Sequence, residues 1–290
     1  MTTSTEAINA VLEAGHDHSP PLSEIQAIFH KDGFLRLNGI LQSIDLDELH
    51  HFSEETFRRI FERLYQNGHT TFPTHKREDT YALGPGVKNG FREIVMRSPG
   101  RYELSLLHSM QAPACVEHLK HNLLAIVPLL LEGCTWDDVS IINLSLVVST
   151  PGSPVQPWHA DGGHVNLQKH LPCHVLNVFV PLHDIALELG PTEIRPGTHY
   201  HTRNLAPMMM AAACRKTLRP RVAPILSATD VLIFDYRVLH RGLANSTANQ
   251  NRTFLVLTVA KPWFKDILNF PSKSLDDPAT TGEVARARHI

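Results

Sequence analysis

The chain has 290 residues, of which 42% are hydrophobic, and its 27 basic and 29 acidic residues leave a formal net charge of −2. The balanced charge argues against a nucleic-acid partner, and no apolar run approaches the roughly 18 residues of a membrane span. A chain of this length can bury a large core, so we expect one domain over residues 1–290; its opening residues lack the features of a signal peptide, so we expect it in the cytoplasm.

The first part of the chain has the apolar spacing of helices. Three helices are predicted there, over residues 22–32, 43–67 and 115–131. The first ends at Asp32-Gly33, and a short strand over 34–40 should follow it. Ser43 is a plausible N-cap of the second helix, which Asn67-Gly68 ends. The third is apolar on most sides, and Pro128 is expected to kink or end it.

From residue 139 onward the pattern changes to short β-branched runs separated by Gly, Pro and Asn, which indicates strands. The predicted strands are Ile141–Val148, Val175–Val180, Val231–Phe234 and Thr253–Val259. A helical first part followed by many strands favours a mainly β fold with flanking helices, a double-stranded β-helix of the jelly-roll, cupin-like kind. Residues 1–20 and 271–290 are polar and are expected to be flexible.

The segment Gln156-Pro-Trp-His159-Ala-Asp161 contains a His-x-Asp triplet, although roughly two such triplets are expected by chance in this composition. The other triplet, at residues 30–32, ends a predicted helix and is better explained as a surface turn. His159 and Asp161 instead follow a strand and a proline turn, and alternate residues at a strand end point to one side. His240 follows another apolar run and is a candidate third ligand.

Two imidazoles and a carboxylate on one face of Fe(II) form the facial triad of non-haem oxygenases, which leaves adjacent positions open for a cosubstrate and O2. Twelve residues after His240, Arg252 begins an apolar strand. A cation at that position is costly without an anionic partner, and a guanidinium suits a carboxylate. The sequence therefore indicates an iron site with an anionic cosubstrate.

These motifs resemble the phytanoyl-CoA dioxygenase-like branch of the Fe(II)/2-oxoglutarate dioxygenases, over most of the chain. The matching segments are Phe29–Phe34, Gln156–Gly162, Gly190–His199, Asp235–Gly242, Asn251–Phe254 and Lys261–Trp263. The resemblance implies that His159, Asp161 and His240 bind Fe(II). It also implies that Arg252 binds the distal carboxylate of 2-oxoglutarate.

The same resemblance implies that Gln156 and Thr192 hydrogen-bond the cosubstrate, although each has a structural alternative. Thr192 could order its turn, and Gln156 could tie a strand end to the backbone. Phe254 departs from the serine found in some relatives near the arginine, so another group must complete the carboxylate pocket. Asn143 and Ser145, on one face of the preceding strand, are candidates.

The resemblance implies an enzyme that oxidises an unactivated C–H bond of a small, mostly apolar metabolite, a natural-product intermediate, and releases succinate and CO2. Hydroxylation is the default outcome; desaturation, epoxidation and rearrangement stay open, while Asp161 disfavours halogenation. Two alternatives remain, a non-catalytic sensor of iron or 2-oxoglutarate and a hydroxylase of acyl-CoA thioesters. The expected partner is a small molecule, and the oligomeric state is left open, a homodimer included.

Three other features allow two interpretations each. The basic segment from Lys88 to Arg101 is either a solvated face, which we favour, or a site for an anionic substrate. The run Met208–Cys214 is either core, which we favour, or a flexible pocket wall. The histidine spacings at 159/164 and 170/174 suit zinc only on a helix, and nearby Gly and Pro residues argue against a helix.

Overall fold

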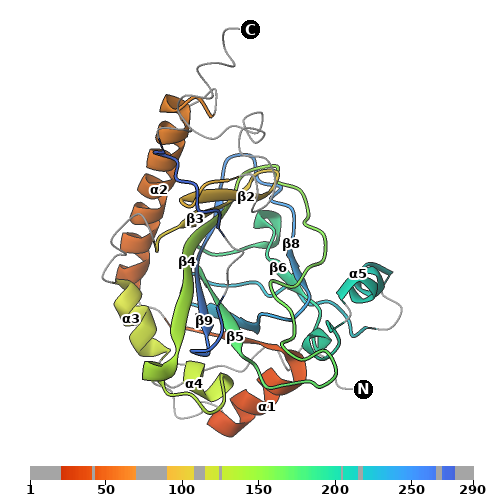
Figure 1. Cartoon of the computed structure of the whole chain (residues 1–290). Helices are drawn as coiled ribbons and strands as arrows, with labels where there is room; N and C mark the ends of the chain where they lie inside the picture. The colour runs from red at the N-terminus through yellow and green to blue at the C-terminus, as the bar shows by residue number, and fades with distance from the viewer. Residues whose placement is uncertain are drawn as a thin grey trace.

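The computed structural model describes residues 21–40, 43–69, 90–107, 115–123, 126–203, 205–214, 218–265 and 270–277. An antiparallel seven-stranded sheet in the order β1-β7-β5-β9-β4-β3-β2 forms its centre, and β6 pairs with β8 in a second sheet (Figure 1). The strands of the large sheet are β1 (Phe34–Leu37), β2 (Ile94–Ser98), β3 (Arg101–Ser105), β4 (Ser140–Ser149), β5 (Val175–Pro181), β7 (Val231–Asp235) and β9 (Arg252–Ala260). Those of the small sheet are β6 (Thr192–Ile194) and β8 (His240–Gly242).

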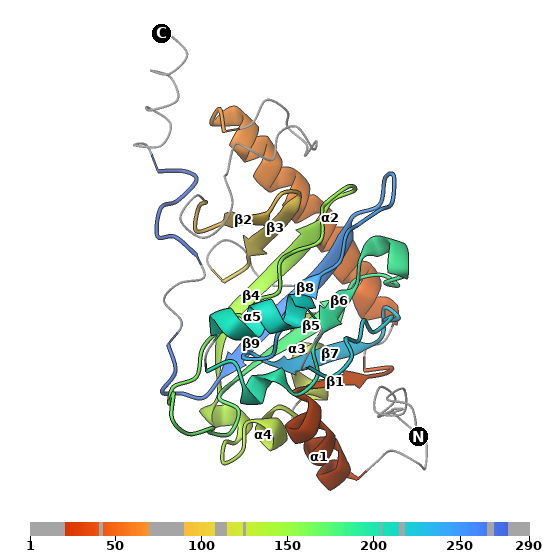
Figure 2. The ribbon, with the colours of Figure 1, turned by 90° about the vertical axis from the view of Figure 1, so that its right-hand side faces the viewer.

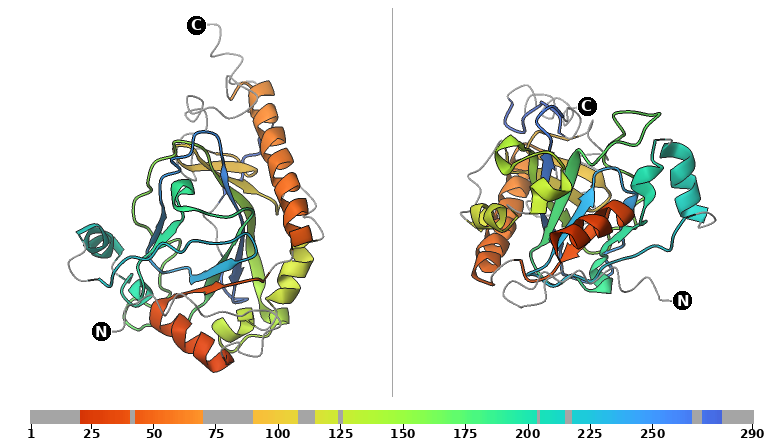
Figure 3. Two further views of the ribbon diagram at one scale, coloured as in Figure 1. Left: turned by 180° about the vertical axis from the view of Figure 1, so that it is seen from behind. Right: turned by 90° about the horizontal axis from the view of Figure 1, so that it is seen from below.

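Helices cover the outer face of the large sheet, and the small sheet lies over its inner face (Figures 1 and 3). The helices are α1 (Leu22–Asp32), α2 (Ser43–Gln66), α3 (Cys115–Asn122), α4 (Ile126–Leu130) and α5 (Leu205–Cys214). Of these, α5 lies apart from the others, beside β6 and β8 (Figure 2). This arrangement confirms the predicted jelly-roll class with flanking helices.

Strand β9 shows why the sheet has two different faces. All nine of its residues are buried, because successive side chains point to opposite faces and both faces are covered. Leu255 and Leu257 pack with the helices in the main core, whereas Phe254 and Val256 pack in a smaller core toward the small sheet. Arg252 shares the parity of Phe254 and faces the interior of the jelly roll, where the predicted site lies.

The helix predictions were correct in position and wrong in one detail. Gly33 ends α1 with a φ of 79°, and its N–H donates to the Phe29 carbonyl at 2.7 Å. The third predicted helix is two helices, α3 and α4, and the break precedes Pro128 instead of coinciding with it. Pro128 lies in the first turn of α4, where a backbone N–H has no intrahelical acceptor and its absence costs little.

Residues 271–290 were predicted to be flexible, and the structure describes the first part of this stretch, residues 271–277. Leu275 is completely buried, and its N–H donates to the Glu93 carboxylate at 2.8 Å. The Ser274 hydroxyl donates to the same carboxylate at 2.7 Å. The segments 1–20 and 278–290, also predicted to be flexible, lie outside the described residues. Among the residues that the structure describes, no helix has the length and apolar character needed to cross a membrane.

Candidate metal centre

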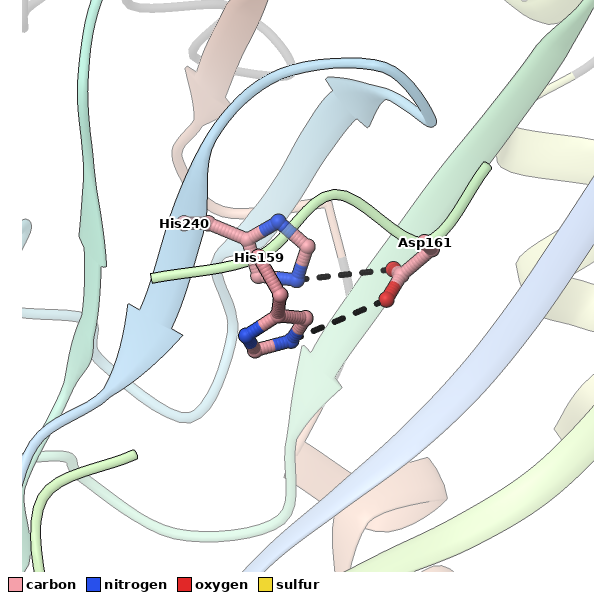
Figure 4. A group of neighbouring side chains, drawn as sticks. All are labelled: His159, Asp161 and His240. Atoms are coloured by element: carbon pink, nitrogen blue, oxygen red, sulfur yellow. Dashed lines mark ion pairs between the residues drawn. The ribbon is translucent and has the colours of Figure 1, made fainter. Parts of the chain in front are cut away.

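His159, Asp161 and His240 converge, although 79 residues separate the second from the third along the sequence. Asp161 Oδ1 lies 3.8 Å from His159 Nε2, and Asp161 Oδ2 lies 3.4 Å from His240 Nε2 (Figure 4). One ligand atom from each residue lies within 4.8 Å of the other two. No other group of three or more His, Cys, Asp or Glu side chains in the described part of the chain is spaced to hold a metal ion.

Backbone pairing between two distant segments aligns the two imidazoles. The His159 N–H donates to the His240 carbonyl at 3.1 Å, and the His240 N–H donates back at 2.9 Å. Each ring directs Nδ1 at a carbonyl that can only accept, on Pro157 at 2.9 Å and on Val238 at 3.1 Å. Nδ1 therefore carries the hydrogen, and Nε2 of both rings keeps a lone pair for a metal.

The carboxylate of Asp161 is held by a relay of two buried side chains. Asn177 Nδ2 donates to Asp161 Oδ2 at 2.6 Å, and the Thr258 hydroxyl donates to Asn177 Oδ1 at 2.8 Å. Because a carboxylate only accepts, the N–H end of the amide must face Asp161, and the amide oxygen then accepts from the Thr258 hydroxyl. Burial, and next the neighbouring His240, lower the pKa of His159 and favour the neutral imidazole that ligates a metal.

A cavity of about 410 Å³ adjoins the three side chains, a volume typical of small-molecule sites. Its lining includes every residue proposed from the sequence except Ser145, namely Asn143, Gln156, His159, Asp161, Thr192, His240 and Arg252. A larger hollow of about 680 Å³ lies between α2 and residues 249–253, and none of the three ligand candidates lines it. The smaller cavity is the one that can bring a molecule to the metal centre.

Two buried arginines, Arg101 and Arg252, form the cationic end of this cavity. Their exposed fractions are 1% and 3%, and both donate to the Ser149 hydroxyl, at 2.7 and 2.8 Å. Their remaining hydrogen bonds go to backbone carbonyls, of Gly190 from Arg252 and of Pro154 and Leu243 from Arg101. Within the described residues, neither guanidinium forms an ion pair, and Nε of each is buried without an acceptor.

This arrangement is electrostatically unfavourable unless an anion binds between the two cations. Burial lowers the pKa of Arg101 to about 10. Burial first, and the charge of Arg101 second, hold the pKa of Arg252 well below its usual range. A carboxylate bound here would supply the missing acceptors and the missing negative charge. The residues present therefore fit both groups that the sequence implied, a divalent iron and a cosubstrate with a distal carboxylate.

The sequence pattern of a family described as phytanoyl-CoA dioxygenase (PhyH) matches residues 29–254. The chain belongs to the phytanoyl-CoA dioxygenase family. The resemblance inferred from the sequence is thereby confirmed, as is the class of enzyme, an Fe(II)/2-oxoglutarate-dependent dioxygenase.

Several solved structures are similar to the dioxygenase. AviO1 from Streptomyces viridochromogenes Tue57 is 21% identical, with a TM-score of 0.59 over 86% of this chain and 99% of its own. HygX from Streptomyces hygroscopicus, solved with nickel, 2-oxoglutarate and hygromycin B, is 15% identical, with a TM-score of 0.55 over 83% and 88%. SnoN, an α-ketoglutarate-dependent epimerase from nogalamycin biosynthesis, is 17% identical, with a TM-score of 0.53 over 83% of each chain. At these identities the likeness establishes the fold.

The residues predicted to assist cosubstrate binding lie in different environments in the dioxygenase. The Gln156 side chain accepts from the Gly242 N–H at 3.0 Å, which is the structural alternative considered for it. Thr192 begins β6 and is buried at the cavity wall. Asn143 and Ser145 both donate to Glu103, at 2.9 and 2.8 Å. Ser149, which the sequence did not indicate, is the hydroxyl beside Arg252.

Of two favoured interpretations of other segments, one is wrong for Arg101 and the other holds for one face of a helix. Arg101 was placed on a solvated face, but it is buried in the cavity wall because β3 pairs with β4 and is covered. The methionine run belongs to α5, of which Ala212 alone is buried among the described residues, and Met210 is 71% exposed. Ala212, with the partly buried Met208 and Met209, packs in a small hydrophobic cluster with Trp158 and Leu239. One face of α5 is therefore core, as favoured, and the helix does not line the cavity.

Arg101 and Asn177 are the functional candidates that sequence reasoning missed. The sequence around each of them contains a pattern that indicates a buried polar residue. In Arg-Tyr-Glu-Leu-Ser, residues 101–105, polar and apolar residues alternate, which indicates a strand with one polar face. Asn177 is a lone amide within the apolar run 175–180, and a buried amide requires partners.

Proposed function

We propose that His159, Asp161 and His240 bind Fe(II) and that Arg252, together with Arg101, binds the distal carboxylate of 2-oxoglutarate. One observation carries the proposal: the three ligand candidates and two buried, unpaired guanidiniums line the same cavity. A metal site alone would not need two buried arginines beside it. The size of an extended dicarboxylate explains why both features lie in one cavity.

When bound, iron and 2-oxoglutarate together supply O2-dependent oxidation of an unactivated C–H bond, with release of succinate and CO2. The residues of the chain position these groups. Asn177 directs the Asp161 carboxylate toward the two imidazoles, and their Nδ1 hydrogens, bound to backbone carbonyls, keep Nε2 available. Hydroxylation is the proposed outcome.

The proposed substrate is a small molecule from natural-product metabolism. Support comes from the similar structures, one solved with hygromycin B and another from nogalamycin biosynthesis, and from the volume of the cavity beside the metal centre. The same cavity favours an enzyme over a sensor, because a sensor needs no substrate space beside its metal.

An anaerobic titration tests the proposal. Fe(II) added with 2-oxoglutarate should produce a visible metal-to-ligand charge-transfer band in the wild-type protein, and His240→Ala should abolish it. Arg36→Met, which removes an arginine paired with Asp230 on the edge strand β1 and outside the cavity lining, is the matched control and should retain the band. A colourless complex from folded wild-type protein would refute the proposed chelation. Succinate release stimulated by small metabolites would then distinguish the enzyme from the sensor.

A further inference from the structure

A second polar cluster lines the cavity, and the metal centre and the cationic end make no use of it. Glu103 is its centre. Its carboxylate accepts from Arg97 Nε at 2.6 Å, from Asn143 Nδ2 at 2.9 Å and from the Ser145 hydroxyl at 2.8 Å. We call these four residues the Glu103 cluster. Glu103, Asn143 and Ser145 are at least nine-tenths buried, and Arg97, Glu103 and Asn143 line the cavity.

We infer that the substrate of this dioxygenase is a neutral molecule with hydroxyl groups, which donate hydrogen bonds to Asn143 and Glu103. The inference rests on the proposed function, since it takes the metal centre as the place of oxidation. It replaces the expectation of a mostly apolar metabolite.

The Glu103 cluster presents acceptors to a ligand. The donors of Asn143 and Ser145 are directed to Glu103, and Asn143 Oδ1 is buried with no partner among the described residues. An ionised carboxylate has about four lone-pair sites, so Glu103 can accept one bond more. An acceptor that is buried without a partner costs free energy, which a ligand donor would recover. The carboxylates of the cosubstrate are acceptors and cannot fill this role.

The charge of the cluster selects a neutral donor. Arg97 and Glu103 form a close ion pair, with side chains 21% and 10% exposed. Because the arginine already compensates the carboxylate, an ammonium group would lose its own hydration without meeting a net negative charge. A hydroxyl group loses less on burial and can satisfy either acceptor.

The cluster also lies at a suitable distance from the metal centre. Asn143, Thr258 and Asn177 are directly paired across β4, β9 and β5, and Asn177 binds Asp161. Adjacent strands are about 4.8 Å apart, so the backbones of Asn143 and Asn177 are on the order of 10 Å apart. A molecule one or two sugar-sized rings long can therefore reach from Asn143 to the metal centre. Val147, Phe179 and Val256 line the cavity and provide contacts for its carbon skeleton.

Ligand-observed saturation-transfer NMR on the metal-free full chain tests this inference independently of iron binding. The probes are neutral mono- to trisaccharides with their methyl glycosides, the polyamine kanamycin, and dodecanoate. Saccharides should give saturation transfer with wild-type protein, and their affinity should fall about tenfold or more in Asn143→Leu, which removes the unpartnered acceptor. Glu103→Gln, which keeps the shape of the side chain, should weaken the same probes. Leu167→Ser, at an exposed position, is the control and should bind as wild type does.

Several results would overturn the inference. These are dodecanoate or kanamycin binding more tightly than every saccharide, saccharide affinity unchanged in both Asn143→Leu and Glu103→Gln, and failure of every saccharide to bind the folded wild-type protein. The proposed function fails by a different observation, the missing charge-transfer band. Because the NMR measurement contains no metal, the two failures are distinguishable.

Discussion

Replacing Arg101 by methionine best distinguishes the contribution of the cosubstrate pocket to binding from that of the metal centre. Burial lowers the pKa of Arg101 from its usual value to about 10, which corresponds to a cost of roughly 3 kcal/mol for keeping the guanidinium charged inside the folded chain. Methionine has a similar length and removes that cost, but it also removes the hydrogen bonds to Ser149, Pro154 and Leu243. We therefore expect a small net change in the stability of the unliganded protein.

The affinity for an anion should change much more than the stability of the unliganded protein. A charge-assisted hydrogen bond to a carboxylate contributes about 1.5–3 kcal/mol, so a loss of about 2 kcal/mol raises the Kd for 2-oxoglutarate roughly thirtyfold. The Fe(II) requirement should not change, because Arg101 supplies no ligand. Arg252→Met should act in the same direction.

The assay is an anaerobic titration of the charge-transfer band with 2-oxoglutarate at saturating Fe(II). Thermal stabilisation of the metal-free protein by succinate, which has two carboxylates and no keto group, provides a second measurement. Arg97→Met is the matched control, since Arg97 lines the same cavity but is already paired with Glu103. An unchanged Kd in Arg101→Met, together with a raised Kd in Arg252→Met, would refute the two-arginine pocket and leave Arg101 a structural role.

Three further predictions concern Asn177, Gly162 and His199. Asn177→Leu removes the donor to Asp161 and should raise the Kd for Fe(II) about 10- to 100-fold in a metal titration; an unchanged Kd would remove Asn177 from the positioning role. Gly162→Ala would place a methyl group 1.7 Å from Tyr236 Cε1, so we expect a loss of about 1–3 kcal/mol in urea unfolding, and wild-type stability would contradict this packing. His199 is 3% exposed, and burial lowers its pKa to about 4. Below pH 6.5 the unfolded chain therefore takes up a proton that the folded chain does not, and the stability of the fold falls as the pH drops from 6.5 toward 4. The free energy of unfolding should therefore decrease between about pH 7.5 and pH 5, and in His199→Gln this decrease should be about 2 kcal/mol smaller than in wild type. An equal decrease in both proteins would mean that His199 does not titrate as its burial requires.

The sequence was most informative where a local pattern carries the signal. The helix stop at Gly33 follows from a residue that tolerates a positive φ, and the strands at 141–148 and 253–259 follow from short β-branched runs. Helix 115–131 was predicted in one piece because apolar spacing continues across it. The expectation that Pro128 would kink or end this helix was wrong because proline is compatible with a first helical turn as well as with a helix end. Only the position of the helix start distinguishes the two cases.

The candidate ligands could also be named in advance, since His159 and Asp161 are two residues apart at a strand end and His240 follows a separate apolar run. Several supporting residues could not be named in advance. Arg101, Asn177 and Glu103 act through partners on other strands, and nothing in their local sequence indicates which strands become neighbours. The polar part of the cavity wall, on which the proposal of a hydroxylated substrate rests, depends on strand pairing in the same way.

The amino-acid sequence by itself determined the class of fold, the family and the identity of the three side chains proposed to bind iron, because these depend on periodicity and short motifs. The tertiary structure decided which polar side chains share the cavity: strand order and register bring Arg101 beside Arg252 through Ser149, and Asn143 into line with Asn177. The physical reason is that hydrogen bonds and charges act over a few ångströms in space. Distances of that size between residues far apart in the chain exist only after the strands have paired.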